Sequence, residues 1–136
     1  ARCGLLDFQD ALEGPRAYDL MSLLEDARRD VPPELARAMT ERYLAAFPDL
    51  SRAQFMSDFA ILAAQRHAKV IGIFTRLLAR DGKPDYLVHI QRVWRRLEHR
   101  LDHPALAGIR DWLARHLPPE ARTVPPRALA GKGMPG

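Results

Sequence analysis

One long helical segment in the middle of the chain constrains the fold more than any other feature. Ser51 can cap a helix while Gln54, three residues later, reaches back to it, which is the spacing of a capping box. Leu50 and Phe55 stand on either side of this cap at the spacing of a hydrophobic staple. Apolar residues then keep helical spacing up to a stop at Asp81-Gly82: Phe55, Phe59, Leu62, Val70, Ile73, Phe74 and Leu77. We therefore predict one long helix between the Ser51 cap and the Asp81-Gly82 stop.

Gly72 lies inside this predicted helix, where a glycine costs about 1 kcal/mol relative to alanine. Close packing against another backbone is a common reason for a glycine at such a position. We therefore expect a neighbouring element to approach the long helix at Gly72.

Four further segments space their apolar residues as helices do. They are expected at about 17–28, 33–47 and 85–101, and after Pro104. A short apolar run at 4–8 (GLLDF) precedes a polar turn containing Gly14-Pro15, and predicts a strand or one arm of a hairpin. The expected fold class is therefore mainly α, a helical lobe with a short strand or hairpin arm at its N-terminus.

The end of the chain differs from this body in composition. Residues 118–136 contain five prolines and three glycines and have almost nothing to bury, so we expect them to be disordered. Residues 1–117 then form the single domain, since 136 residues are enough for one hydrophobic core and too few for two.

The charge and cysteine content exclude several classes of protein. The net charge is +4, of which the tail contributes +2 through Arg122, Arg127 and Lys132 against Glu120, so the body is nearly balanced. We therefore expect no nucleic-acid and no membrane partner, and no stretch approaches the roughly 18 apolar residues of a membrane span. Cys3 is the only cysteine, which excludes an internal disulfide and favours the reducing cytoplasm.

Asp7 lies where the predicted strand ends and a turn begins, with Asp10 three residues later. Carboxylates at strand ends are well placed to bind a hard cation such as Mg²⁺. By spacing alone, however, an aspartate that stabilises the turn is the commoner explanation. Asp19, near a helix start, is by itself most simply a helix-stabilising acid.

Two separated runs of sequence resemble the aminoglycoside-phosphotransferase-like kinases. They are GLLDFQDALEGPRAYDLMSLLEDAR (4–28) and AAQRHAKVIGIFTRLLARDGKPDYLVHI (63–90). Both are most similar to the branch of cell-wall sugar kinases that phosphorylate N-acetylmuramate and N-acetylglucosamine at the anomeric carbon. The resemblance covers about residues 4–117 and implies the helical C-lobe of a protein-kinase-like fold, with ATP and Mg²⁺ as cofactors.

The resemblance implies roles for three residues at the N-terminal end. Asp7 of LLDFQD matches the family's metal-binding aspartate, which would hold Mg²⁺ on the nucleotide phosphates, with Phe8 packed behind it. Asp19 of AYDL matches the acid that accepts hydrogen bonds from the catalytic-loop backbone, a structural support of the site. Metal binding thereby becomes the favoured role of Asp7, while Asp10 keeps a loop-stabilising role.

Other parts of the family's machinery have no match in this chain. There is no glycine-rich phosphate loop, no strand lysine for the nucleotide and no His-x-Asp…Asn catalytic loop before DFQD. In the family these parts supply the base, the second metal ligand and most nucleotide contacts. We expect them upstream of Ala1, so this chain is predicted to be the C-terminal part of a kinase and to transfer no phosphate alone.

Polar residues on two of the predicted helices are further candidates. Gln65, Arg66 and Lys69 lie in a segment that helps to build the acceptor side of the cleft in the family, so we predict contact with substrate. A buried hydrogen-bonding or salt-bridging role within the lobe is an equal alternative. On the later helix, Arg92, Arg95, Arg96 and Arg100 form a basic strip, for which a solvated face or an acidic partner surface is commoner than nucleic-acid binding.

The resemblance implies a kinase whose intact form transfers the γ-phosphate of ATP to the anomeric hydroxyl of an N-acetylated amino sugar. Two alternatives stay open: a kinase-like phosphotransferase with another acceptor, such as an aminoglycoside or a choline-like molecule, and a non-catalytic helical interaction module with a basic strip. The expected partners are the sugar and the missing N-terminal half of the same protein. Helix faces that normally meet that half would be exposed here, so we expect the isolated chain to self-associate.

Overall fold

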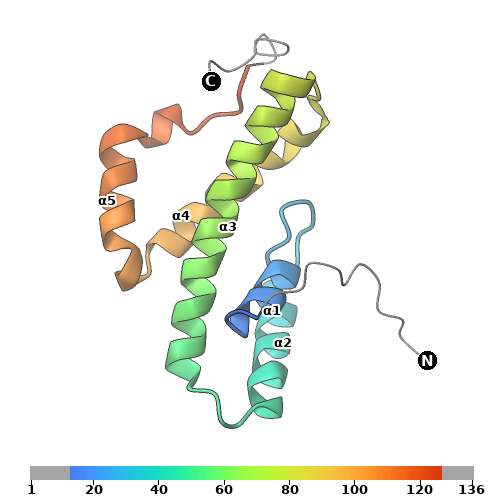
Figure 1. Ribbon diagram of the computed structural model, residues 1–136, viewed down its shortest axis with the longest axis vertical. Coiled ribbons are helices and arrows are strands. Elements are labelled where there is room, and N and C mark those ends of the chain that lie inside the picture. The colour runs from blue at the N-terminus through green and yellow to red at the C-terminus, as the bar shows by residue number, and fades with distance from the viewer. Residues whose placement is uncertain (1–12, 127–136) are drawn as a thin grey trace, which may run out of the picture.

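The computed structural model describes residues 13–126 (Figure 1). Its elements are, in chain order, α1 (Ala17–Leu24), α2 (Pro33–Ala46), α3 (Arg52–Asp81), the 3₁₀ helix η1 (Asp85–His89), α4 (Ile90–Leu101), η2 (Pro104–Leu106), α5 (Ala107–His116) and η3 (Pro119–Ala121). The described part of the chain is helical without a strand, which confirms the mainly α fold class. The strand predicted at 4–8 lies outside the described residues.

Helix α3 is the spine of the fold. It has 30 residues, which makes it about 45 Å long. Helices α1 and α2 lie beside its first half, and α5 lies on the opposite side (Figure 1). Most contacts between elements join α3 to α1 or to α4. None of the helices within residues 13–126, α3 included, is both long and apolar enough to cross a membrane.

The start of α3 confirms the cap that the sequence predicts. The backbone N–H of Gln54 donates to Ser51 Oγ at 3.4 Å. The reciprocal bond is absent, because the Gln54 side chain donates to Asp58 Oδ1 at 2.8 Å, one turn further along the helix. Leu50 and Phe55 belong to the same apolar cluster, as the hydrophobic staple requires.

The end of α3 is also as predicted. Gly82 has the left-handed conformation, with φ of 64°, and the N–H groups of Gly82 and Lys83 bond to the last free carbonyls of the helix. The close approach predicted at Gly72 is wrong, since no heavy atom of another element lies within 4 Å of where a Cβ would stand. Gly72 lines an open apolar groove instead.

Two apolar clusters lie along α3 and share it as a common wall. The first joins α1 to the first half of α3, with α2 packed from the side; its buried members are Ala17, Met21, Leu24, Phe55, Phe59 and Ala63. The second joins the rest of α3 to η1, α4 and η2; its buried members are Ala64, Phe74, Leu78, Leu87, Ile90, Val93, Trp94, Leu97, Leu101 and Leu106. Ala63 and Ala64 are neighbours in sequence, so the clusters meet at the middle of α3.

Two of the predicted helix boundaries differ from those observed. Helix α1 ends at Leu24 rather than near residue 28, because Glu25 leaves the helix and pairs with two side chains of α3 and α4. The helix predicted at 85–101 begins as the 3₁₀ turn η1 and becomes α-helical at Ile90. Leu87 and Ile90 are both buried at a spacing of three residues, which a 3₁₀ turn places on one face.

Packing contacts continue beyond the predicted domain boundary at residue 117. Arg122 donates to Glu98 Oε1 at 2.9 Å and lies over the Trp94 ring, and Val124 packs against the second apolar cluster. Residues 118–126 therefore keep contacts with α4, because the long Arg122 side chain covers apolar surface while its charge is paired. The disorder predicted for 127–136 concerns residues that the structure does not describe.

Candidate functional site

Asp7, predicted to hold the metal, and Phe8, predicted to pack behind it, lie outside the described part of the chain, so their roles remain predictions. Within residues 13–126 there is no group of three or more His, Cys, Asp or Glu side chains that could hold a metal ion. Asp19 is described: it lies in the first turn of α1 and is exposed. Its support of a catalytic loop remains a prediction.

The structure does not bring the three candidate residues of α3 together in one site. Arg66 donates to the Tyr18 hydroxyl at 3.1 Å and lies over the Tyr18 ring, in an exposed contact with α1. Gln65 is exposed and lines the groove on the other side of α3, and Lys69 is exposed. Helical geometry separates Gln65 from Arg66, since successive residues are rotated by about 100° around a helix. Substrate contact by Gln65, Arg66 and Lys69 remains a prediction.

The groove beside Gln65 is an apolar hollow between α3, α4 and α5. Its volume is about 680 Å³, and its walls include both tryptophans, Trp94 and Trp112, together with Gly72. On the α5 side, Ile109 and Trp112 are half exposed, and no residue of α5 is buried. The groove thus has an apolar surface with one amide side chain at its edge.

A buried charged cluster joins α1, α3 and α4. His67 is 1% exposed, and its Nε2 lies 2.7 Å from Glu25 Oε2. Arg100 donates to the other oxygen of the same carboxylate, and its guanidinium lies over the Phe59 ring. Burial raises the pKa of the Glu25 carboxyl, but hydrogen bonds and charge from His67 and Arg100 outweigh burial and lower that pKa below 4.5.

Our sequence analysis did not single out this cluster. The sequence does place His67 on the apolar face of the long helix, because it lies four residues after Ala63 and three before Val70. A polar side chain on such a face needs a buried partner. The identity of that partner depends on the path of the chain between α1 and α2.

The basic strip of α4 is largely engaged inside the molecule. Arg92 donates to Asp30 Oδ2 at 2.7 Å, and Arg96 donates to the Arg29 carbonyl at 2.9 Å. With Arg100 these arginines repeat every four residues and hold the loop between α1 and α2, and their side chains are about one-fifth to one-quarter exposed. Arg95 points off this face and is exposed. Three of the four arginines are therefore internal contacts rather than a solvated face or a surface for an acidic partner.

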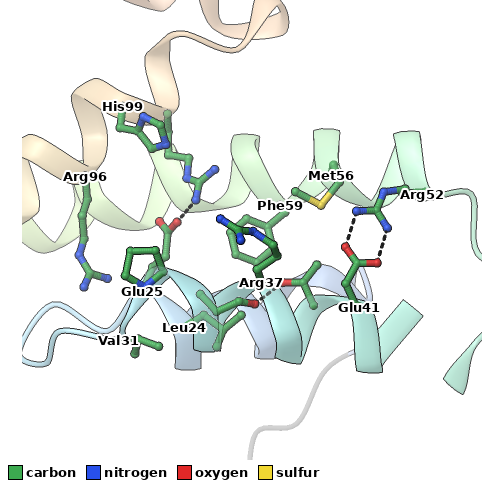
Figure 2. A pocket seen from close by; sticks show the side chains of 14 residues that line it. Leu24, Glu25, Val31, Arg37, Glu41, Arg52, Met56, Phe59, Arg96 and His99 are labelled. Carbon is green, nitrogen blue, oxygen red and sulfur yellow. Dashed lines mark hydrogen bonds and ion pairs between the residues drawn. The ribbon is translucent and has the colours of Figure 1, made fainter. Parts of the chain in front are cut away.

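A second hollow, which we call the α2–α4 cleft, opens between these two helices with α3 as its back wall (Figure 2). Its volume is about 440 Å³. Apolar side chains, among them Leu24, Val31 and Phe59, line its interior, and charged side chains of α2 and α4 stand around them. Arg52 closes one side of the cleft by a bidentate ion pair with Glu41, in which the Nη1–Oε2 distance is 2.6 Å.

Comparison with known proteins gives consistent family matches. The sequence profile of the phosphotransferase enzyme family matches residues 1–56. The chain is 47% identical over 122 residues to the N-acetylmuramate/N-acetylglucosamine kinase of Caulobacter vibrioides, which is 90% of this chain and 34% of the relative. It is 41% identical over 118 residues to the kinase of that name from Pseudomonas aeruginosa, covering 82% of this chain and 35% of the relative. It is 44% identical over 108 residues to the kinase of that name from Neisseria meningitidis serogroup B, which is 70% of this chain and 32% of the relative.

The chain thus spans about a third of the length of the curated relatives that it matches. The similarity extends over most of the present sequence, from the segment that precedes α1 to the later helices.

Proposed function

This chain belongs to the phosphotransferase enzyme family, and on that basis we propose that the whole protein is a sugar kinase. The proposed reaction transfers the γ-phosphate of ATP, with Mg²⁺, to the anomeric hydroxyl of an N-acetylated amino sugar. The observation that carries the proposal is the 47% identity to an N-acetylmuramate/N-acetylglucosamine kinase over 90% of this chain. Because the chain spans a third of that relative, the activity is proposed for the whole protein, in the cytoplasm, and not for this chain alone.

In this proposal the chain supplies a helical support for the reaction site. Asp7 would hold the Mg²⁺ of the nucleotide, and the general base would come from a preceding part of the protein. Asp19, in the first turn of α1, would accept hydrogen bonds from the catalytic loop. The burial of Ala17 and Met21 against α3 supports this role, because it gives Asp19 a defined position on a rigid element.

The first alternative, a kinase-like phosphotransferase with another acceptor, shares the fold, so the fold does not distinguish it from the proposed sugar kinase. Aminoglycoside and choline-like acceptors are disfavoured by the names of the relatives, which specify N-acetylated amino sugars. The helical interaction module rested on the basic strip, and Arg92, Arg96 and Arg100 are occupied by the α1–α2 loop. No observation favours that module.

The proposal is tested by assaying the full-length protein with ATP, Mg²⁺ and four acceptors: N-acetylmuramate, N-acetylglucosamine, an aminoglycoside and choline. We expect ADP to form with the two amino sugars, and ³¹P NMR to show a phosphate on the anomeric oxygen. Asp7→Ala should lower kcat by at least about a hundredfold, because the metal neutralises charge on the transferred phosphoryl group. Asp111→Ala, at an exposed carboxylate of α5, is the matched control.

Each result separates one part of the proposal from the others. A full rate in Asp7→Ala would overturn the metal role while leaving the kinase intact. Phosphorylation of the aminoglycoside or choline alone would overturn the acceptor. Absence of Mg²⁺-dependent nucleotide binding would overturn the proposed kinase.

A further inference from the structure

The α2–α4 cleft has an unbalanced charge. Four arginines and two glutamates line it: Arg37, Arg52, Arg96, Arg100, Glu25 and Glu41. Three of the arginines have carboxylate partners, which are Glu41, Asp30 and Glu25. Within residues 13–126, Arg37 forms no ion pair. The cleft therefore presents one guanidinium whose charge is not neutralised by the part of the chain described.

Arg37 is placed where a ligand in the cleft would meet it. Its side chain is exposed and extends from α2 into the cleft, in front of Phe59 (Figure 2). His99 lines the same cleft from α4 and is exposed. Donors from two helices thus face a common volume, and a guanidinium presents paired N–H groups that match the two oxygens of a carboxylate.

The rest of the cleft suits a small molecule with an apolar part. Its volume of about 440 Å³ lies within the range of small-ligand pockets, and Leu24, Val31 and Phe59 provide apolar surface inside it. An apolar interior with a few placed polar groups is the usual composition of a small-ligand site, and the guanidinium of Arg37 favours an anionic ligand there. The charge excess and the shape therefore indicate the same class of ligand.

We propose that the α2–α4 cleft binds the carboxylate of a small acidic sugar, with Arg37 as its principal contact. The choice of a sugar rests on the proposed function. The two sugars in the names of the relatives form a natural matched pair, because N-acetylmuramate is N-acetylglucosamine with an added lactyl ether that carries a carboxylate. The cleft contributes to binding of the acidic member of the pair, and so sets the preference between the two acceptors.

The test is calorimetric titration of the full-length protein with each of the two sugars. In Arg37→Gln we expect the ratio of the Kd for N-acetylmuramate to the Kd for N-acetylglucosamine to rise about tenfold, the effect of losing a charged hydrogen-bonding partner. Arg42→Gln is the matched control, since Arg42 lies on the same helix, is exposed and does not line the cleft. It should leave the ratio unchanged.

The outcomes distinguish this inference from the proposed function. If both sugars are phosphorylated but the ratio of their Kd values is the same in wild type and in Arg37→Gln, the carboxylate site is overturned and the kinase stands. An equal rise in the ratio for Arg42→Gln would also overturn the site, because it would reflect general surface charge. If the wild-type protein binds neither sugar, both the proposed function and the assignment of this ligand fail.

Discussion

At the scale of single residues, Gly72 inside α3 and Gly82 at its C-cap should respond in opposite ways to replacement by alanine. Gly72 lies in the helix interior with open space around the position of a Cβ, whereas Gly82 has a φ of 64°. We predict that Gly72→Ala raises the free energy of unfolding by about 1 kcal/mol, because alanine is favoured inside a helix. Gly82→Ala should lower it by about 1 kcal/mol, because a side chain strains the left-handed conformation. Midpoints of urea unfolding measure both, and a fall in the midpoint of Gly72→Ala would contradict the open surroundings seen here.

Glu25 is the residue on which the charged cluster depends. Glu25→Gln removes the charge that pairs with Arg100 and His67, and we predict a loss of about 3 kcal/mol in the free energy of unfolding at neutral pH. The control is Glu34→Gln, at an exposed position in the first turn of α2. A loss of the same size in both variants would show that the cluster does not matter for stability.

The same cluster predicts a dependence of stability on pH. The pKa of Glu25 is lower in the folded state than its ordinary value of 4.5, so the unfolded chain binds the proton more readily. The stability that the ionised carboxylate contributes is therefore present above about pH 4.5 and is lost as the pH falls through the lower folded-state pKa. The free-energy difference between wild type and Glu25→Gln, measured by urea unfolding from pH 7 to pH 3, should shrink over that window. A constant difference would contradict the lowered pKa.

At the scale of elements, helix α4 is the anchor of the loop between α1 and α2. Arg96 contacts the Arg29 carbonyl and the Asp30 carboxylate, in a segment that forms no regular helix. We predict that Arg96→Ala speeds amide hydrogen exchange of residues 26–31, because local opening of the loop then costs less free energy once these contacts are removed. Arg95→Ala is the matched control, one position away on the exposed side of the same helix. Equal exchange in the two variants would show that the loop is held by its own packing.

At the scale of the whole molecule, the groove between α3 and α5 is an apolar surface that the described residues leave partly uncovered. Ile109 and Trp112 are 52% and 53% exposed there. The chain spans only about a third of the length of its relatives. We predict that the isolated 136-residue chain self-associates through this groove, and that the association is insensitive to salt because apolar burial drives it. Light scattering after size exclusion should show Trp112→Lys shifted toward monomer.

The control for this prediction is Val88→Lys, at a residue of η1 that is 75% exposed and outside the groove. It should leave the association unchanged. A clean monomer for the wild-type chain at all salt concentrations would contradict the prediction, and so would an equal effect of the two substitutions.

Local signals in the sequence determined the elements of this fold. The Ser51 cap, the Leu50–Phe55 pair and Gly82 define the two ends of α3, because capping and termination depend on residues within one turn of each other. The motif runs at 4–28 and 63–90 also identified the family, which the comparisons confirm. The metal role of Asp7 and the substrate contacts of Gln65, Arg66 and Lys69 remain predictions from that resemblance.

Contacts between distant residues were decided by the tertiary structure alone. Glu25 meets a histidine 42 residues away and an arginine 75 residues away, and no periodicity indicates such a pairing. The same holds for the basic strip, which the sequence predicts as a surface and which anchors a loop in the structure. It also holds for Arg37, which forms no ion pair with the residues that the structure describes, since this is visible only once the other charges are placed. The physical reason is that helix formation depends on neighbours within a turn, whereas the partner of a charge depends on how the whole chain closes around it.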